Sequence, residues 1–258
     1  MNERRSASVP RSVERAIAIL KAFGETTADL GVTDLSQRLD LPKSTIHRLL
    51  TALERGGLVE QNPATEKYRL GIELVRLAGL VLTRIDLQQV AGPHLYALAQ
   101  ACEETVNLSI LTGDDKVINI ARFPSPHMVR NVGWIGREMF PHSVSSGKVL
   151  LAYLPKERVE CVLAAGLPRF TNRTITDPVR LRGELARVRQ QGYAVAQEEL
   201  EEGLSAVAAP IVNHEGHVVA AISISGPSFR LTEERLIQLV EMARRAGKAV
   251  SRQLGWAG

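Results

Sequence analysis

The segment from Pro42 to Arg55 constrains the fold of this chain more than any other part of the sequence. Its apolar residues recur every three or four positions, which predicts an α-helix with one buried face. The opposite face carries short hydrogen-bonding side chains mixed with cations, and these begin in the first turn. The predicted buried face consists of Ile46, Leu49, Leu50 and Leu53, and the predicted outward face of Lys43, Ser44, Thr45, His47, Arg48 and Thr51.

Two shorter helices are predicted before this segment. Apolar residues at helical spacing place the first within residues 11–23. Thr33 followed by Asp34 predicts the N-cap and first turn of a second helix that ends at Leu39.

A β-hairpin is predicted after the third helix. Residues 58–61 and 67–70 alternate between apolar and polar side chains on either side of a polar turn. Three short helices followed by a hairpin predict a winged helix-turn-helix domain over residues 11–70, behind a flexible basic arm at residues 1–10.

The third helix of such a domain enters the major groove of DNA with its N-terminal residues at the base edges. Arg48 can bind guanine through two hydrogen bonds, and serine or threonine hydroxyls can donate or accept at several bases. Cations on the hairpin would pair with phosphates. The predicted DNA-binding residues are Lys43, Ser44, Thr45, His47, Arg48, Thr51, Lys67 and Arg69. A small helical domain with a merely solvated polar face is the alternative.

The segment from Gly71 to Arg84 is apolar on nearly every side of a predicted helix, within a linker at residues 71–86. A helix of this kind has to be buried, either in its own chain or against a second copy. The second copy agrees better with DNA binding, because winged helices usually bind two-fold symmetric sites as dimers. We therefore expect a dimer and a palindromic operator.

Residues 87–258 show strands interspersed with helices, which predicts a second, α+β domain with a largely antiparallel sheet. The fold class is thus α+β with two domains. The predicted strands are residues 105–111, 116–123, 206–212 and 218–225, and the predicted helices 87–102, 147–154, 155–165, 178–191 and 232–254.

The composition of the chain indicates where the protein is located in the cell, but it does not identify the function. The N-terminus has no apolar stretch of the secretory type and no segment is long and apolar enough to span a membrane, so we expect a cytoplasmic protein without a membrane partner. Cys102 and Cys161 have no partner spacing and are expected to be buried small residues. A formal charge of +4 does not by itself indicate a nucleic-acid binder.

Two serine pairs in the second domain are candidates for ligand binding. Ser145 and Ser146 lie at a predicted helix start, where unpaired backbone N–H groups favour an anion, although simple capping is an equal alternative. Ser223 and Ser225 lie on one face of a predicted strand, where a ligand, a neighbouring loop or water has to supply hydrogen-bond partners. The segment 198–203 contains four glutamates, and such an acidic run is more typical of a solvated surface.

No catalytic constellation is recognisable. Ser145 and Lys148 have the Ser-x-x-Lys spacing of some acyl-transfer enzymes, but the accompanying motifs are absent, as are the flanking residues of a P-loop. His214 and His217 have no third metal ligand nearby in sequence. We expect neither an enzyme nor a metal or other cofactor.

Six segments in series resemble the isocitrate-lyase-regulator (IclR) family of bacterial transcription regulators, over about residues 9–254. They are Ser12–Leu20, Leu41–Leu50, Lys67–Gly71, Ser146–Lys148, Ala208–Ile211 and Ile222–Pro227. The resemblance implies a GAF-like effector domain behind the winged helix, dimers through the N-terminal region and tetramers through the effector domains. It also implies an effector that is a small organic acid or an aromatic carboxylate, and repression more often than activation.

The resemblance also assigns effector contacts. They fall on Ser145, Ser146, Ser223, Ser225, Ala196 and Ala206. Many relatives have an acid and a thiol at the last two positions, so the alanines indicate a more apolar effector, such as an aromatic one, unless Asn107 or Glu198 supplies the missing contact. The expected function is allosteric control of operator binding. A Ser/Lys hydrolase and a sensory adaptor without DNA binding are the alternatives.

Overall fold

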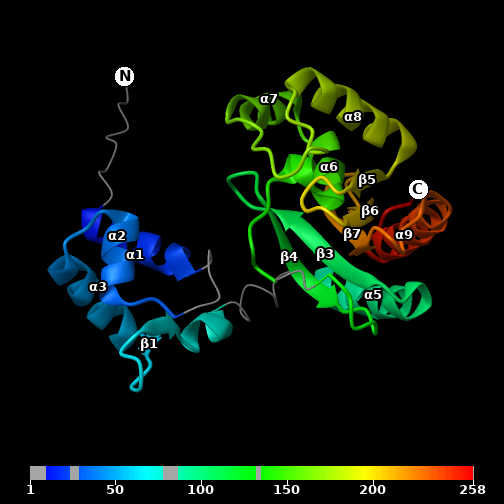
Figure 1. The fold of residues 1–258 in the computed structure, drawn as a ribbon. Coiled ribbons are helices and arrows are strands. Elements are labelled where there is room, and N and C mark those ends of the chain that lie inside the picture. The colour runs from blue at the N-terminus through cyan, green and yellow to red at the C-terminus, as the bar shows by residue number, and fades with distance from the viewer. Residues whose placement is uncertain (1–9, 24–28, 78–86, 132–134, 258) are drawn as a thin grey trace. The chain divides into compact units, whose positions relative to one another are not determined.

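The computed structural model describes residues 10–23, 29–77, 87–131 and 135–257. The chain divides into two compact units, residues 1–85 and 86–258, each of which is described by itself (Figure 1). No helix in the described ranges is long and apolar enough to cross a membrane.

The N-terminal unit is the predicted winged helix-turn-helix. Helices α1 (Arg11–Ala22), α2 (Val32–Leu39) and α3 (Lys43–Arg55) pack around one apolar core, and β1 (Val59–Gln61) pairs antiparallel with β2 (Tyr68–Leu70). Tyr68 also forms a β-bridge with Leu30, which joins the hairpin to the segment before α2. The core consists of Ile19, Ala22, Phe23, Leu30, Leu35, Ile46, Leu49, Leu50, Leu53, Val59 and Tyr68.

The prediction that Thr33 caps α2 is wrong. The helix begins at Val32, and Gly31 is its N-cap. The carboxylate of Asp34 accepts a hydrogen bond of 2.8 Å from the backbone N–H of Gly31. Because this side chain satisfies a backbone donor from inside the first turn, the helix starts without a hydroxyl cap, and Thr33 is exposed.

The predicted linker helix is described only in part. Residues 73–77 are helical, and residues 78–86 lie outside the described residues. Within the described part, Ile72 is 76% exposed and Val75 65% exposed.

The C-terminal unit contains a five-stranded antiparallel sheet with the strand order β4-β3-β7-β6-β5. The strands are β3 (Thr105–Leu111), β4 (Val117–Phe123), β5 (Ala194–Gln197), β6 (Leu204–Val212) and β7 (Val218–Pro227). The antiparallel sheet was expected, but β5 was not, because four residues are too few to show a strand pattern. A β-bulge in the β3–β4 pairing separates Leu108 from Ser109.

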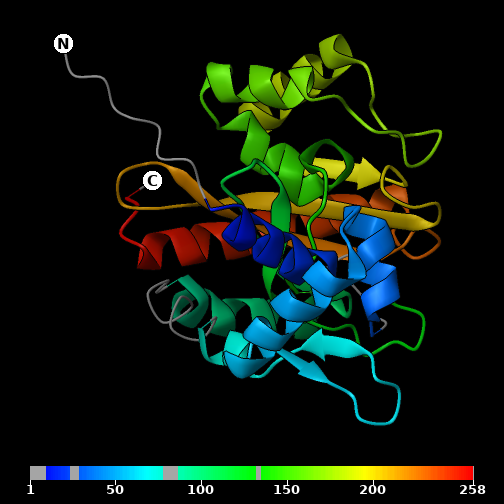
Figure 2. The ribbon, with the colours of Figure 1, turned by 90° about the vertical axis from the view of Figure 1, so that its left-hand side faces the viewer.

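Helices cover both faces of this sheet (Figures 1 and 2). On one face lie α5 (Leu87–Cys102) and α9 (Glu233–Gln253), and on the other α6 (Ser145–Ala152), α7 (Lys156–Ala164) and α8 (Pro178–Gln191), preceded by the 3₁₀ turn η2 (Pro141–Ser143). Alternation in β7 turns Ile222 and Ile224 to one side and Ser223 and Ser225 to the other. Cys102 is buried as expected, but Cys161 on α7 is exposed.

Candidate functional site

Helix α3 separates its two faces as its sequence predicts. Ile46 and Leu50 are fully buried, whereas Lys43, Ser44, His47 and Arg48 are exposed, and Thr45 and Thr51 are half-buried. The hydroxyl of Thr51 donates to the backbone oxygen of His47 at 2.9 Å, so its proton is already used within the helix. The N-terminal turn of α3 therefore offers the polar, cationic surface of this unit.

The two cations predicted on the hairpin differ in their surroundings. Lys67 is exposed, whereas the guanidinium of Arg69 lies 2.5 Å from a carboxylate oxygen of Glu60 across the strand pair. Both partners are about half exposed, so this pair contributes little to stability and can open toward a phosphate.

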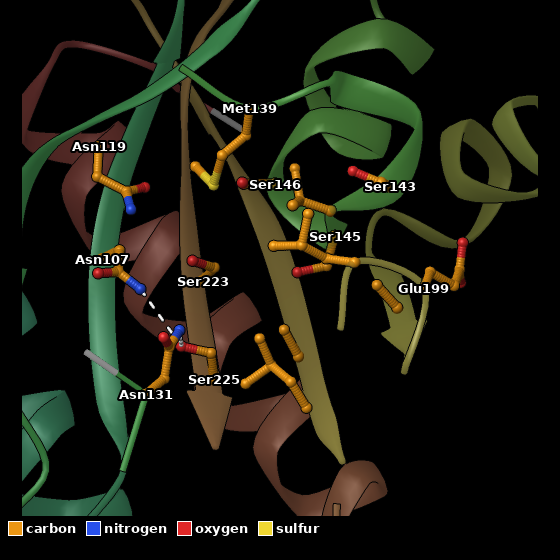
Figure 3. A pocket seen from close by; sticks show the side chains of 15 residues that line it. Asn107, Asn119, Asn131, Met139, Ser143, Ser145, Ser146, Glu199, Ser223 and Ser225 are labelled. Carbon is orange, nitrogen blue, oxygen red and sulfur yellow. Dashed lines mark hydrogen bonds between the residues drawn. The ribbon is translucent and has the colours of Figure 1, made fainter. Parts of the chain in front are cut away.

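A cavity of about 450 Å³, including its open mouth, lies between α6 and the sheet of the C-terminal unit (Figure 3). Polar residues of β3, β4 and β7 face the start of α6 across the cavity. The lining residues are Asn107, Asn119, Asn131, Met139, Ser143, Val144, Ser145, Ser146, Ala196, Glu199, Leu200, Leu204, Ala206, Ser223 and Ser225.

The start of α6 has no side-chain cap. Its N-cap residue is Val144, and the first intrahelical hydrogen bond runs from the N–H of Lys148 to the oxygen of Val144 at 3.0 Å. Ser145 is 1% exposed and Ser146 3%, yet neither hydroxyl has a hydrogen-bond partner among the described residues. Capping therefore does not account for these serines, and they line the cavity beside unpaired backbone N–H groups.

Glycine at position 147 allows α6 to start where it does. A Cβ atom there would lie 2.3 Å from the backbone oxygen of Pro141. The 3₁₀ turn thus packs directly against the first turn of α6, and this contact fixes the direction in which the helix start faces the cavity.

The two serines of β7 have different partners. Ser225 accepts hydrogen bonds from the amide nitrogens of Asn131 at 2.9 Å and Asn107 at 3.4 Å, and it donates to the oxygen of Thr105. Ser223 is 6% exposed and has no hydrogen-bond partner among the described residues. Neighbouring side chains therefore satisfy Ser225 but not Ser223.

A buried ion pair lies beside the cavity. Lys148, 1% exposed, donates to Glu199 at 2.5 Å and to the backbone oxygen of Val195 at 3.1 Å, and Glu184 lies 3.7 Å away. Burial raises the pKa of Glu199 above its ordinary value, and the nearby ammonium group of Lys148 opposes the shift. Because its ammonium is held by these oxygens, Lys148 is not positioned as a general base for Ser145.

The cavity brings together most of the residues that were predicted as effector contacts. Ser145, Ser146, Ala196, Ala206, Ser223, Ser225 and Asn107 all line it. Glu198 does not: its backbone adopts a left-handed conformation (φ 57°), and its carboxylate lies 3.6 Å from Arg173. This turn places Glu199 rather than Glu198 at the cavity wall.

Sequence reasoning missed several lining residues, among them the polar residues Asn119, Asn131 and Glu199. The sequence of β4 does not single out Asn119, because the same strand carries a second polar residue, Arg122. His214 and His217 are exposed on the turn between β6 and β7, and no group of three metal-binding side chains occurs among the described residues.

Comparisons with known proteins agree with both units. Residues 12–63 match the family described as IclR helix-turn-helix domain, and residues 79–252 match that described as bacterial transcriptional regulator IclR C-terminal. The chain is 38% identical over 247 residues to the HTH-type transcriptional regulator XynR of Escherichia coli, covering 95% of this chain and 98% of that protein. It is 38% identical over 246 residues to the HTH-type transcriptional repressor AllR of Salmonella typhi, covering 95% and 90%.

A solved structure shows the same fold. It is an IclR homolog complexed with 4-hydroxybenzoate from Microbacterium hydrocarbonoxydans, with 31% sequence identity and a TM-score of 0.82. The match covers 94% of this chain and 98% of that one.

A helix-turn-helix with a hairpin, joined to an α+β domain that carries a cavity with polar and apolar walls, defines a DNA-binding regulator with an effector domain. The chain belongs to the IclR family of bacterial transcription regulators, with an IclR-type helix-turn-helix and a GAF-like effector domain. This is a family of regulators and not of enzymes.

Proposed function

We propose that this regulator represses transcription from a palindromic operator, and that a small organic acid bound in the cavity controls its affinity for that operator. It acts in the cytoplasm, on chromosomal DNA. The observation that carries the effector assignment is the uncapped start of α6, where buried hydroxyls and backbone N–H groups without partners among the described residues face the cavity. Such a site favours a carboxylate.

The exposed face of α3 supports DNA binding. Ser44, His47 and Arg48 stand on the first turns of the helix with no apolar neighbour covering them within the described part of the N-terminal unit. The side chains proposed to contact DNA are those predicted from the sequence, with Arg48 at a base and Lys43, Lys67 and Arg69 at phosphates. Thr51 contributes less because its hydroxyl is bonded within the helix.

Exposed apolar residues support self-association. Val13 and Ile17 on α1 are each 48% exposed, and Ile72 and Val75 after the hairpin are more exposed still. Exposed apolar side chains of this size favour burial against a second copy. We propose that residues 11–70 bind DNA, that residues 71–86 join the dimer, and that effector domains at residues 87–258 pair dimers into tetramers.

Selection of binding sites from a pool of random duplexes tests the proposal. Wild-type protein should enrich a two-fold symmetric site whose half-site centres lie about 34–36 Å, or a multiple of this, apart. Arg48→Ala should weaken binding by roughly 1–3 kcal/mol and relax one base position.

Arg55→Ala is the matched control. It removes the same charge from the same helix, about 10 Å further along the axis, and should weaken binding to all sequences alike. If wild-type protein enriches no sequence at low ionic strength, the chain is a sensory adaptor without DNA binding, and the proposal is wrong.

A further inference from the structure

A groove lies between helices α7 and α8 of the C-terminal unit (Figure 1). It holds about 720 Å³, including the space open to solvent, and none of its lining residues lines the cavity at the start of α6. The end of α6 and the residues that follow it contribute to its floor. The residues that line this α7–α8 groove are Leu151, Ala152, Leu154, Lys156, Val159, Glu160, Arg182, Leu185, Ala186 and Arg189.

The floor of the α7–α8 groove is apolar. Leu151 and Leu185 are buried, Leu154 and Val159 are half-buried, and Ala186 is exposed. The last three side chains leave apolar surface in contact with water, and covering this surface with the apolar body of a ligand is favourable.

An ion pair joins the two helices near the start of α8. The guanidinium of Arg182 donates two hydrogen bonds to the carboxylate of Glu160 on α7, at 2.9 and 2.6 Å. Because the two charges are paired, this end of the groove attracts neither anions nor cations strongly.

Two cations without such partners stand at the other end. Lys156 begins α7 and Arg189 lies in the last turn of α8; both are exposed, and neither forms an ion pair or a side-chain hydrogen bond among the described residues. Burial raises the pKa of Tyr153, and the charge of Arg189 opposes this shift, so Arg189 lies near the residue that ends α6 just before α7. The positive end of the α7 dipole is at the same place.

The charge of the surrounding layer acts in the same direction. Residues 145–191, which include α6, α7 and α8, contain nine lysines and arginines but only four acids. This segment therefore has a formal charge of +5, whereas the whole chain has +4. An anion is drawn to this layer more than to the rest of the molecule.

We propose that the α7–α8 groove binds an amphipathic anion with one charged head and an alkyl body, of the class of medium-chain acyl carboxylates. The head pairs with Lys156 and Arg189, and the chain covers Leu154, Val159 and Ala186. One head rather than two is expected, because the opposite end of the groove is occupied by a neutral ion pair. The site shares no residue with the effector cavity, so the inference does not rest on the proposed function.

Calorimetric titration of the full chain with alkyl ions below their micelle concentrations tests the proposal. The probes are hexanoate, octanoate and decanoate, with decyltrimethylammonium as the cation of matched chain length. Decanoate should bind at least about 10-fold more tightly than decyltrimethylammonium, because its head meets two cations. Among the carboxylates, affinity should rise by up to roughly 4-fold for each added CH₂ group that the floor buries.

Three substitutions at exposed positions assign the binding to the groove. Lys156→Gln combined with Arg189→Gln should weaken decanoate by roughly 10-fold and should not weaken decyltrimethylammonium. Ala186→Glu places a carboxylate on the floor and should also weaken decanoate. Arg187→Gln is the matched control, because this exposed arginine of α8 pairs with Glu184 at 3.0 Å and does not line the groove, so binding should persist.

Each other outcome contradicts a part of the proposal. Equal binding of decanoate and decyltrimethylammonium overturns the choice of an anion, and equal binding of hexanoate and decanoate overturns the role of the apolar floor. Undiminished binding of decanoate to the double variant places the acid elsewhere, for example in the effector cavity, and overturns the site. Absence of binding by all three carboxylates overturns the proposal as a whole.

Discussion

The ammonium nitrogen of Lys148 lies 2.5 Å from Oε1 of Glu199, and both residues are buried. Lys148 belongs to α6, one turn after Ser145, whereas Glu199 follows β5 and lines the cavity. Glu184 on α8 completes the cluster at 3.7 Å. The pair therefore joins the helix that starts at the cavity to the segment that forms part of its wall.

Removing the cation should destabilise the C-terminal unit. Lys148→Met leaves the carboxylate of Glu199 buried without a partner, which typically costs about 3–5 kcal/mol at neutral pH. Urea unfolding of this variant and of Lys156→Met, an exposed lysine on α7, measures the difference. Equal midpoints for the two variants would show that the buried pair contributes nothing.

The destabilisation caused by Lys148→Met should depend on pH. Burial raises the pKa of Glu199, so folding favours its protonated form. Its contribution to stability is complete below its ordinary pKa of 4.5 and is lost as the pH rises through its value in the folded chain. Without Lys148 this loss grows, and the destabilisation by Lys148→Met should be smaller at pH 5 than at pH 7.

His142 should make the chain sensitive to acid. Its ring is fully buried beside Phe140 and Phe170, its Nε2 donates to the oxygen of Pro168 at 2.9 Å, and its Nδ1 has no partner among the described residues. Burial lowers the pKa of His142 below its ordinary value of 6.5. The neutral ring therefore contributes stability above pH 6.5, which is lost as the pH falls through the pKa in the folded chain.

Unfolding free energies between pH 7 and pH 5 test this expectation. Wild-type protein should lose stability toward pH 5, and His142→Gln, which keeps a donor for Pro168 and cannot become charged, should lose less. Parallel curves for the two proteins would show that folding does not shift the pKa of the ring. His214→Gln, at an exposed position, is the control and should follow the wild type.

Gly147 should tolerate no side chain. A Cβ atom would lie 2.3 Å from the Pro141 oxygen and 2.4 Å from its Cα, and both atoms belong to the backbone. Gly147→Ala should therefore destabilise by roughly 1–3 kcal/mol and weaken effector binding, because α6 has to move. Gly183→Ala, on α8 with open space around it, should instead stabilise by about 0.5–1 kcal/mol. Thermal unfolding of the two variants distinguishes these effects, and a shift of the same sign in both would contradict the packing argument.

The sequence predicts α3 well because helical periodicity is local. Ile46, Leu49, Leu50 and Leu53 are buried as their spacing requires, and the outward face follows from them. Strand β5 and the wall of the cavity were predicted less well, because they depend on contacts between distant segments.

Asn119 illustrates why the site was only partly predictable. Asn107 pairs with Arg122 across the β3–β4 ladder, whereas Ser109 pairs with Asn119. The bulge between these pairs reverses the alternation, so Asn119 joins Asn107 and Ser109 on the cavity face. A bulge of this kind is set by the pairing of two strands and leaves no signal in either strand alone.

Ser225 shows the same limit. The sequence left open whether a ligand, a neighbouring loop or water supplies hydrogen-bond partners to the two β7 serines, and it treated the serines alike. In the structure the amide of Asn131, from a distant loop, bonds Ser225, and no such bond reaches Ser223 among the described residues. Contacts with a distant loop thus decide that Ser223, rather than Ser225, is left to bond an effector.

We propose that the cavity controls the DNA-binding face of α3. The most direct test of this control is the dissociation constant of a selected operator, measured by fluorescence anisotropy without effector and with a saturating concentration of an acid that binds the wild-type protein. We expect the constant to change by about 5-fold or more, and the acid's own affinity to change by the same factor when operator is present. An operator affinity that stays the same while calorimetry shows the acid bound would contradict the account.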